Sequence, residues 1–319
     1  MTDPVPLQAV VPEALAGQRL DQALASLFAD YSRERLKQWI KQGHVTLNGE
    51  VVSRPRDKVA GGEQVVVRVQ SEPQGEWQAE SIPLRIVYQD DHLLVVDKPV
   101  GLVVHPAAGN YDGTLLNALL HHDPALRSLP RAGIVHRLDK ETSGLMVVAR
   151  TLPAQHALVR QLQARTVHRS YQAVVWGVLI AGGTVEAPIG RHPVHRQRMA
   201  VVAGGREAIT HYRVAERFRA HTLLNVQLET GRTHQIRVHM AHLHHPLVGD
   251  PVYGGRHRQL AGAGESLAAR LASFRRQALH AGRLELIHPA SGEQVGWEAP
   301  PPEDMVDLIA ALREDAAGG

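Results

Sequence analysis

The sequence predicts an α+β protein in two parts: a small domain of two helices and a hairpin, then a larger domain built on a mixed, mainly antiparallel sheet. Three observations predict this class. Apolar residues near the N-terminus repeat at helical spacing, an Asn-Gly pair separates two short apolar runs, and the rest of the chain has many short β-type runs with irregularly spaced helices. A repeated strand-helix alternation, which would predict a parallel sheet, does not occur.

The small domain is expected over residues 14–75. One buried helix face is predicted by the spacing of Leu20, Ala23, Leu24, Leu27 and Phe28. A second helix follows Ser32, a good N-cap, and ends at Gly43. Its expected buried residues are Leu36, Trp39 and Ile40. The pair Asn48-Gly49 favours a type I′ turn and therefore a hairpin, and residues 63–69 supply another strand.

The larger domain is expected over residues 82–300, after a linker at 76–81 that is rich in polar residues and shows no periodicity. A C-terminal helix and acidic tail are expected over 301–319. Helices are predicted to begin at Thr114 and to span 154–164. Short runs of β-branched residues predict strands at 84–88, 92–98, 101–105, 133–135, 145–149, 171–178, 208–214, 221–229 and 283–287.

Composition narrows the class of protein. The 319 residues are 44% hydrophobic and carry a net charge of +3, so the total charge is weak support for a polyanionic partner. The distribution is stronger support, because residues 33–58 hold seven Lys or Arg against three acids. The absence of Cys excludes disulfides and thiolate chemistry and fits a reducing compartment. No apolar run is long enough for a membrane span, so we expect a cytoplasmic protein that does not bind membranes.

The most informative stretch is His-Arg-Leu-Asp-Lys-Glu-Thr-Ser-Gly-Leu over residues 136–145. Apolar runs on both sides predict a strand, a tight loop and a second strand, with Asp139 on the loop between cations. A carboxylate held in this way is a candidate nucleophile, although an isolated Arg-x-Asp is more often an ion-paired loop residue. The rest of the chain decides between these interpretations.

Three further segments accompany it. Residues 169–177 place Tyr171 at the start of a strand, where a lone Tyr normally packs in the core. Residues 228–239 combine a strand, a glycine turn and a helix-compatible run that carries Arg232 and Arg237. Residues 245–254 are rich in turn-forming residues and are expected to form a cleft wall or a packing loop.

The N-terminal part resembles the S4 RNA-binding domain, on the residues Gln18-Arg19-Leu20-Asp21, Ser32-Arg33 and 45–49. The alternative is a solvated basic helix on an ordinary small domain. The resemblance implies that the basic face of the second helix contacts RNA phosphates, which would make binding salt-sensitive without specifying sequence. The expected contact residues are Arg33, Arg35, Lys37 and Lys41.

The segments at 136–145, 169–177, 228–239 and 245–254 follow the order of the RluA/RluD-type pseudouridine synthases, and the chain resembles that family from about residue 17 to 300. With the S4-like domain, the resemblance extends to members that act on large-subunit (23S) ribosomal RNA. It implies that a uridine is flipped out of the RNA, that its C–N glycosidic bond breaks, and that the uracil is rejoined to the sugar through C5.

The same resemblance implies a role for each site residue. Asp139 acts on the ribose as an ionised carboxylate, as in glycosidases, and Arg237 is the cation that keeps it ionised. Tyr171 stacks on the uracil and takes the C5 proton. Arg137 fills the space left by the flipped base. His136 and Arg232 are expected to contact RNA.

No metal or cofactor is implied, because substrate and product are isomers. The expected partner is 23S ribosomal RNA, free or in a large-subunit assembly intermediate, and we expect a monomer. Two alternatives stay open from the residues alone. One is an RNA-binding assembly factor without catalysis, which activity of an Asp139 variant would distinguish. The other is a metal-dependent hydrolase suggested by the His-rich residues 239–245, although the His-Glu-x-x-His pattern is missing and activity in EDTA would exclude it.

Overall fold

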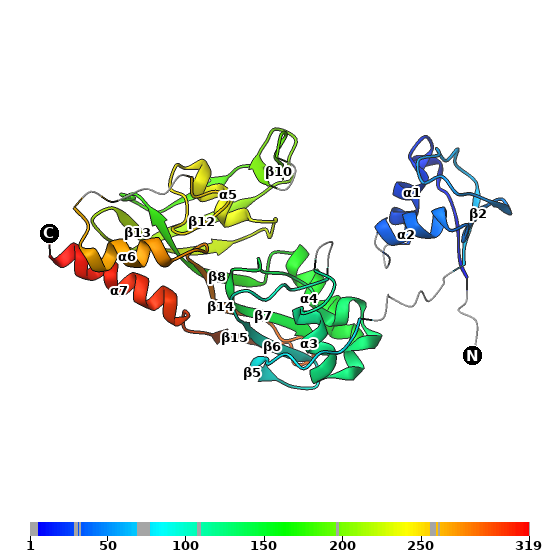
Figure 1. The fold of residues 1–319 in the computed structure, drawn as a ribbon. Helices are drawn as coiled ribbons and strands as arrows, with labels where there is room; N and C mark the ends of the chain where they lie inside the picture. Colours follow the sequence, from blue (N-terminus) through cyan, green and yellow to red (C-terminus); the bar gives the residue numbers. More distant parts are fainter. Residues whose placement is uncertain are drawn as a thin grey trace. The chain divides into compact units, whose positions relative to one another are not determined.

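The computed structural model describes residues 6–28, 31, 33–68, 77–106, 110–195, 198–255, 260 and 262–318, without the side chains of residues 34 and 35. The chain divides into two compact units, residues 1–76 and 77–319, and Figure 1 follows the chain through both. The expected N-cap Ser32 lies outside the described residues.

The first unit packs two helices against a small antiparallel sheet. Its sheet has the order β1-β4-β2-β3, and its strands are β1 (Leu7–Val10), β2 (Val45–Leu47), β3 (Glu50–Val51) and β4 (Gln64–Val67). The helices are α1 (Leu20–Leu27) and α2 (Arg33–Lys41), preceded by the 3-10 helix η1 (Glu13–Leu15). The predicted helix faces are confirmed, because Leu20, Leu24 and Trp39 are fully buried in one core.

Two backbone positions explain how this unit turns. Gly43 has φ +78° and ends α2 in the left-handed conformation that favours glycine. Asn48 and Gly49 have φ +48° and +87°, as the two central residues of a type I′ turn require, and they join β2 to β3. The hairpin predicted from the Asn-Gly pair is confirmed.

The second unit is built on a nine-stranded sheet with the order β5-β6-β7-β14-β8-β13-β12-β9, to which β15 adds beside β14. All pairings are antiparallel except β7 with β14, so the predicted mixed, mainly antiparallel sheet is confirmed. Its strands are β5 (Arg85–Gln89), β6 (Leu93–Lys98), β7 (Ser143–Ala149), β8 (His168–Trp176), β9 (Gly183–Glu186), β12 (Ile209–Arg217), β13 (His221–Leu228), β14 (Leu279–Ile287) and β15 (Gln294–Glu298). A separate two-stranded sheet joins β10 (Ile189–Arg191) and β11 (Met199–Val201).

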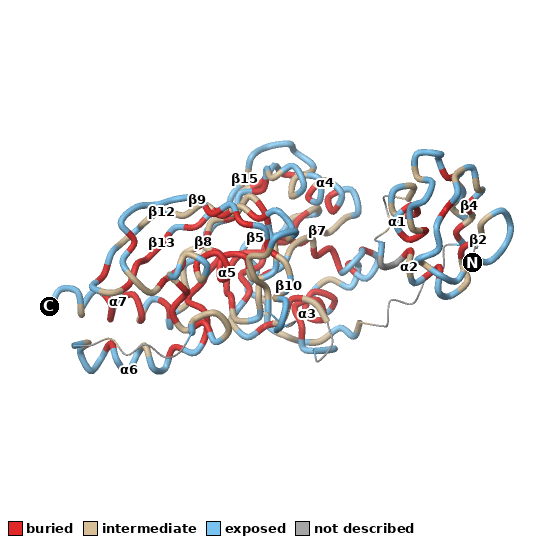
Figure 2. Tube along the Cα trace, turned by 90° about the horizontal axis from the view of Figure 1, so that it is seen from above, coloured by how far each residue is buried: buried red, intermediate tan, exposed pale blue. Residues whose placement is uncertain are grey.

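Helices cover both faces of the large sheet. On one face, α3 (Leu115–His122) and α5 (Gln235–His242) share a core with alternate residues of β6, such as Leu94 and Val96. On the other face, α4 (Leu152–Gln163) packs on Leu93 and Val95, and α6 (Glu265–Ser273) and α7 (Glu303–Ala317) form a further core. Buried residues therefore run along β8 and α5 in Figure 2. No helix of the described residues is long and apolar enough to cross a membrane.

Two predicted strands are wrong. Residues 101–105 form a turn in which Val103 makes a single bridge to Thr114, because Pro99 and the left-handed Gly101 (φ +82°) interrupt the extended run. Gly133 ends the 3-10 helix η3 (Pro130–Gly133), and of residues 133–135 only Ile134 bridges to β7. Gly133 has no room for a side chain, since a Cβ there would lie 1.9 Å from the carbonyl oxygen of Ala149.

Some elements carry no sequence pattern strong enough to predict them. These are β1, β9, β10, β11, β15, α6 and the 3-10 helix η2 (Pro124–Ser128). Residues 77–80, which the sequence assigns to the linker, belong to the second unit. The backbone N–H of Glu80 donates to the carbonyl of Asn117 at 3.0 Å, and the Asn117 amide donates to the carbonyl of Gln78 at 2.8 Å.

Candidate active site

A cleft of about 860 Å³ opens on the face of the large sheet that α5 covers. Three segments that are far apart in the sequence form its walls: residues 134–139, the start of β8, and residues 228–237. Asp139, Tyr171 and Arg237 all line it. The structure therefore brings the three predicted catalytic residues together in one cavity.

A buried lysine holds the loop that carries Asp139. The Lys98 ammonium, 1% exposed, donates to the carbonyl oxygens of Pro99, Leu102 and Lys140 at 2.8, 3.0 and 3.0 Å. Burial lowers the pKa of Lys98 to about 8, against the opposing effect of nearby carboxylates. The carbonyl of Asp139 also accepts the N–H of Thr142 at 3.0 Å. The backbone carbonyls of Asp139 and Lys140 are thus both held by hydrogen bonds.

Arg237 links Asp139 to a second carboxylate. Its Nη1 donates to Asp139 Oδ2 at 2.9 Å, while its Nε and Nη2 donate to Asp250 Oδ2 and Oδ1 at 2.7 and 2.9 Å. The Asp250 side chain is fully buried, and its Oδ1 also accepts the backbone N–H groups of Val252 and Tyr253 at 2.8 and 3.0 Å. The bidentate pair fixes the guanidinium plane, so that Nη1 points at Asp139.

The charges of this cluster favour the charged form of Arg237. Burial alone would lower the pKa of Arg237, but the pairs with Asp250 and Asp139 raise it above its ordinary value. One cation thus faces two carboxylates. Asp139 Oδ1 accepts no hydrogen bond from the described residues, and the Nε2 atom of His234 lies 3.8 Å from it. That oxygen is available to a substrate.

Two aromatic residues and a histidine lie in or beside this part of the cleft. Tyr171 on β8 is 6% exposed, and burial raises the pKa of its hydroxyl. The Arg237 guanidinium lies 5.0 Å from the centre of the Tyr253 ring. The Tyr253 hydroxyl accepts the N–H of Met199 at 3.0 Å and lies 2.8 Å from His234 Nδ1. Burial lowers the pKa of His234, which favours its neutral form.

The predicted RNA contacts of this unit also line the cleft. Arg137 is exposed, beside Asp139 in the chain. Arg232 donates through Nε to the carbonyl of Glu207 at 2.8 Å. His136 accepts the N–H of Val147 at its Nε2, 3.0 Å away, and burial lowers its pKa to about 3. His136 is therefore neutral near pH 7 and holds the loop to β7 rather than adding charge.

Sequence reasoning missed Asp250, His234, Tyr253 and Arg169, all of which lie in or behind this cleft. Asp250 and Tyr253 fall in the turn-rich segment 245–254, where an acid between Gly249 and Pro251 was the available signal. The partner of a buried carboxylate is set by tertiary contacts, so no sequence pattern indicates that Arg237 joins two acids.

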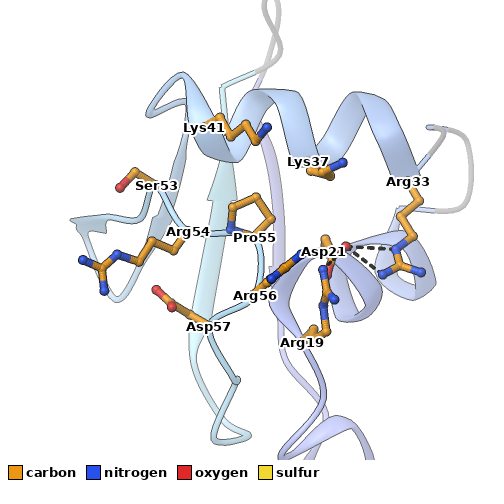
Figure 3. Close-up of a pocket in the computed structure, with 10 residues that line it drawn as sticks. All are labelled: Arg19, Asp21, Arg33, Lys37, Lys41, Ser53, Arg54, Pro55, Arg56 and Asp57. Carbon is orange, nitrogen blue, oxygen red and sulfur yellow. Dashed lines mark hydrogen bonds and ion pairs between the residues drawn. The ribbon is translucent and has the colours of Figure 1, made fainter.

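The first unit carries its own candidate site, a pocket of about 870 Å³ (Figure 3). Asp21, 1% exposed, accepts two hydrogen bonds from Arg19 and two from Arg33 at 2.7–3.0 Å. Burial would raise the pKa of Asp21, but the two arginines hold it below its ordinary value. Lys37 and Lys41 extend from α2 over the same pocket.

The pocket is more basic than the sequence pattern alone predicted. Arg33, Lys37 and Lys41 line it as expected, and the side chain of Arg35 lies outside the described residues. Three arginines that the helical pattern did not predict also line it: Arg19, Arg54 and Arg56. They come from the start of α1 and from the segment after β3, so only the folded chain gathers them.

The His-rich segment 239–245 forms hydrogen bonds within the core. His239 is fully buried, with Nδ1 2.9 Å from Thr210 Oγ1 and Nε2 3.0 Å from the carbonyl oxygen of Ala187. His245 Nδ1 lies 2.8 Å from the carbonyl oxygen of Trp176. Within the described ranges, no three His, Asp or Glu side chains form a group that could hold a metal ion.

The fold and the cleft define a protein that places an arginine-held carboxylate and a buried tyrosine in one cleft, and whose chain also carries a separate basic unit. Family comparisons agree. The profile of the RNA pseudouridylate synthases matches residues 92–242, and that of the S4 domain matches residues 18–65. The chain belongs to the RNA pseudouridylate synthase family and is an isomerase with an S4 domain.

Curated relatives match nearly the full chain. The ribosomal large subunit pseudouridine synthase D of Pseudomonas aeruginosa is 60% identical over 315 residues, 99% of this chain and 98% of that protein. The proteins of the same name from Xanthomonas campestris and Escherichia coli K12 are 61% and 56% identical, over 97% and 99% of this chain and 93% and 97% of theirs.

Solved structures agree with the fold. Human RNA pseudouridylate synthase domain containing 1 aligns with a TM-score of 0.55 and 28% identity, covering 73% of this chain and 89% of that one. Human RNA pseudouridylate synthase domain containing 4 gives 0.55 and 27%, covering 72% and 93%. The predicted family, on the motifs at 136–145, 169–177 and 228–239, is confirmed.

Proposed function

We propose that this enzyme isomerises specific uridines of the large-subunit (23S) ribosomal RNA, with Asp139 as the nucleophile on a flipped-out uridine. The names of the bacterial relatives, which are 56% to 61% identical over nearly the whole chain, support the substrate. Ribosomal RNA, free or in a large-subunit assembly intermediate, would be met in the cytoplasm. The reaction rearranges one nucleoside and consumes no cofactor.

One observation carries the mechanism: the chain of ion pairs from Asp250 through Arg237 to Asp139, at the wall of the cleft that Tyr171 also lines. A carboxylate attacks a sugar only if it is ionised and correctly oriented. In this proposal Arg237 holds Oδ2 of Asp139 and places a positive charge beside it, while Oδ1 accepts no hydrogen bond from the described residues. Asp250 keeps the guanidinium in place, because it occupies the other two donor positions.

The steps follow from this arrangement. The target uridine leaves its stack at a cost of about a few kcal/mol. Arg137, exposed at the cleft, fills the vacated position and contacts phosphate. The Asp139 carboxylate stabilises or captures C1′ of the ribose as the bond to N1 breaks. After the uracil turns, C5 bonds to C1′, and in this proposal Tyr171 takes the proton from C5.

The S4 unit contributes affinity in this proposal. Asp21 pairs with Arg19 and Arg33 in its pocket, but one carboxylate does not balance two arginines, and Lys41, Arg54 and Arg56 add further positive charge that can meet phosphate oxygens. Phosphate contacts position RNA without reading its sequence. The choice of uridine therefore rests with the shape of the RNA and with the catalytic cleft.

The test is a map of pseudouridines in 23S RNA from cells that lack the gene, compared with cells that express the wild-type protein or Asp139→Asn. We expect pseudouridines at particular sites to disappear, to return with the wild-type protein, and to stay absent with the variant although it binds RNA. If Asp139→Asn restores the pseudouridines, the alternative that the domain only binds RNA, without catalysis by Asp139, is favoured. An unchanged map in the deletion strain would contradict the substrate.

A further inference from the structure

Arg169 is buried without a counterion. Three arginines are less than a tenth exposed in the described part of the chain: Arg169, Arg237 and Arg276, at 8%, 4% and 5%. Arg237 and Arg276 each form a bidentate pair with an aspartate. The Arg169 side chain has no carboxylate partner and no hydrogen bond among the described residues, and its buried Nε has no acceptor.

A lone buried guanidinium is costly, because the charge loses its water shell and gains nothing in exchange. The structure nevertheless keeps room for it. A Cβ on Gly231 would lie 2.8 Å from Arg169 Nη1, so any larger residue there would push the guanidinium away. Gly231 and Arg169 both line the catalytic cleft. The unpaired N–H groups of Arg169 therefore lie at a cleft that binds a ligand.

The position of Arg169 identifies the part of the ligand that it meets. It precedes Tyr171 by two residues on β8, so both side chains lie on the cleft face of the sheet. Arg169 acts to lower the pKa of the Tyr171 hydroxyl and Asp139 acts to raise it, within a net rise caused mainly by burial. The side chains of Arg169, Tyr171 and Asp139 thus surround the same part of the cleft.

A phosphate of the RNA backbone does not fit this location. The exposed Arg137 and the half-exposed Arg232 are at the accessible parts of the cleft, where a backbone runs. Arg169 is 92% buried beside the tyrosine on the sheet, where the deepest part of an extruded nucleotide, its base, ends up. Uracil becomes anionic when its bond to the sugar breaks, so it supplies the missing negative charge.

We propose that the Arg169 guanidinium binds the flipped uracil and stabilises the uracil anion formed when the C1′–N1 bond breaks. This inference rests on the proposed function. As that bond breaks, its electron pair moves to N1 and spreads to the two carbonyl oxygens, while the Asp139 carboxylate takes over C1′. When C5 then bonds to C1′, the carboxylate is released, C5 loses its proton and N1 gains one, so the product is an isomer of the substrate.

The test compares two substrates with three proteins under single-turnover conditions. A 23S-derived RNA carries uridine or 5-fluorouridine at the target position, and the readout is loss of the original nucleoside after nuclease digestion. Fluorine withdraws electrons and stabilises the uracil anion by itself. Removing one such donor typically lowers a rate by about 10²–10³-fold. We expect the rate of Arg169→Gln on uridine to fall by that factor. On 5-fluorouridine the fall in rate should be at least about tenfold smaller. Arg169→Lys should recover part of the rate on uridine.

Controls separate this role from others. The affinity for RNA and its salt dependence should match the wild type, and the melting temperature should not fall, since a neutral side chain replaces an unpaired charge. Equal losses on the two substrates, or a salt slope reduced by about 1, would assign Arg169 to a phosphate and overturn the proposal. If Arg169→Gln does not fold, the same comparison of the rate losses on uridine and on 5-fluorouridine is made with Arg169→Lys. An inactive wild-type enzyme would overturn the proposed function itself.

Discussion

Replacing Asp250 with Asn tests whether the ion-pair chain positions the nucleophile. Asp250 is fully buried and accepts four hydrogen bonds, two from Arg237 and two from backbone N–H groups. An asparagine has the same shape, but it loses the charge and turns one acceptor into a donor that faces the guanidinium. Arg237 then keeps only Asp139, whose side chain is 17% exposed.

The expected loss of stability is about 3–5 kcal/mol, the usual cost of removing one partner of a buried pair. A change of 1 kcal/mol shifts the melting temperature by roughly 2–4 °C in a domain of 150–250 residues. The catalytic unit should therefore melt roughly 6–20 °C lower. Single-turnover activity should fall by about 10²-fold below the wild type at a temperature where both proteins are folded, because Asp139 loses its orientation.

The matched control is Asp123→Asn, which removes the carboxylate from another Arg–Asp pair outside the cleft. That pair is more exposed, at 15% for the Asp123 side chain and 23% for Arg150, so a smaller loss of stability and full activity per folded molecule are expected. Thermal melts monitored by circular dichroism and single-turnover pseudouridine assays provide the readouts. Wild-type activity in Asp250→Asn would refute the positioning argument, and an unchanged melting temperature would refute the stability argument.

Three further predictions follow from other parts of the chain. Tyr171→Phe should bind RNA normally but form product about 10²–10⁴-fold more slowly, and wild-type kinetics would exclude Tyr171 as the base for C5. Lys41→Gln and Arg56→Gln should each reduce the slope of log affinity against log salt by about 0.9, with Arg313→Gln as a control; unchanged slopes would place the RNA elsewhere. His221 is fully buried without a hydrogen-bond partner among the described residues, and burial lowers its pKa from 6.5 to about 4. The unfolded chain then binds this proton at higher pH than the folded protein does, so the unfolding free energy should drop as pH falls from 6.5 to 4, and His221→Phe should flatten that dependence in urea titrations.

The sequence predicted the elements whose patterns are local. The helix faces of Leu20 and Trp39, the Asn48-Gly49 turn and the long strands of the large sheet depend on neighbours within a few residues. Short edge strands such as β9 and β15 have no such pattern, because pairing with a long neighbour is what holds them extended. The apolar run at 101–105 misled the prediction, since Gly101 and the bridge to Thr114 bend it into a turn.

The residues of the candidate site also fall into those that sequence motifs predict and those that only the folded chain shows. Asp139, Tyr171 and Arg237 stand in motifs that resemble a known family, and the structure brings them into one cleft. Asp250 and Arg169 were beyond sequence reasoning for opposite reasons. Asp250 matters through a partner 13 residues away in the chain, and Arg169 matters because it has none among the described residues. Both properties exist only after the strands and α5 have packed.

The most direct test of the central claim is pseudouridine formation by purified Asp139→Asn on a 23S-derived RNA under single-turnover conditions, with RNA affinity measured in parallel. We expect no detectable product and a dissociation constant for RNA close to that of the wild type. Because Arg237 keeps its bidentate pair with Asp250, the variant should also stay folded. Product formed at the wild-type rate would contradict the claim that the Asp139 carboxylate carries out the reaction.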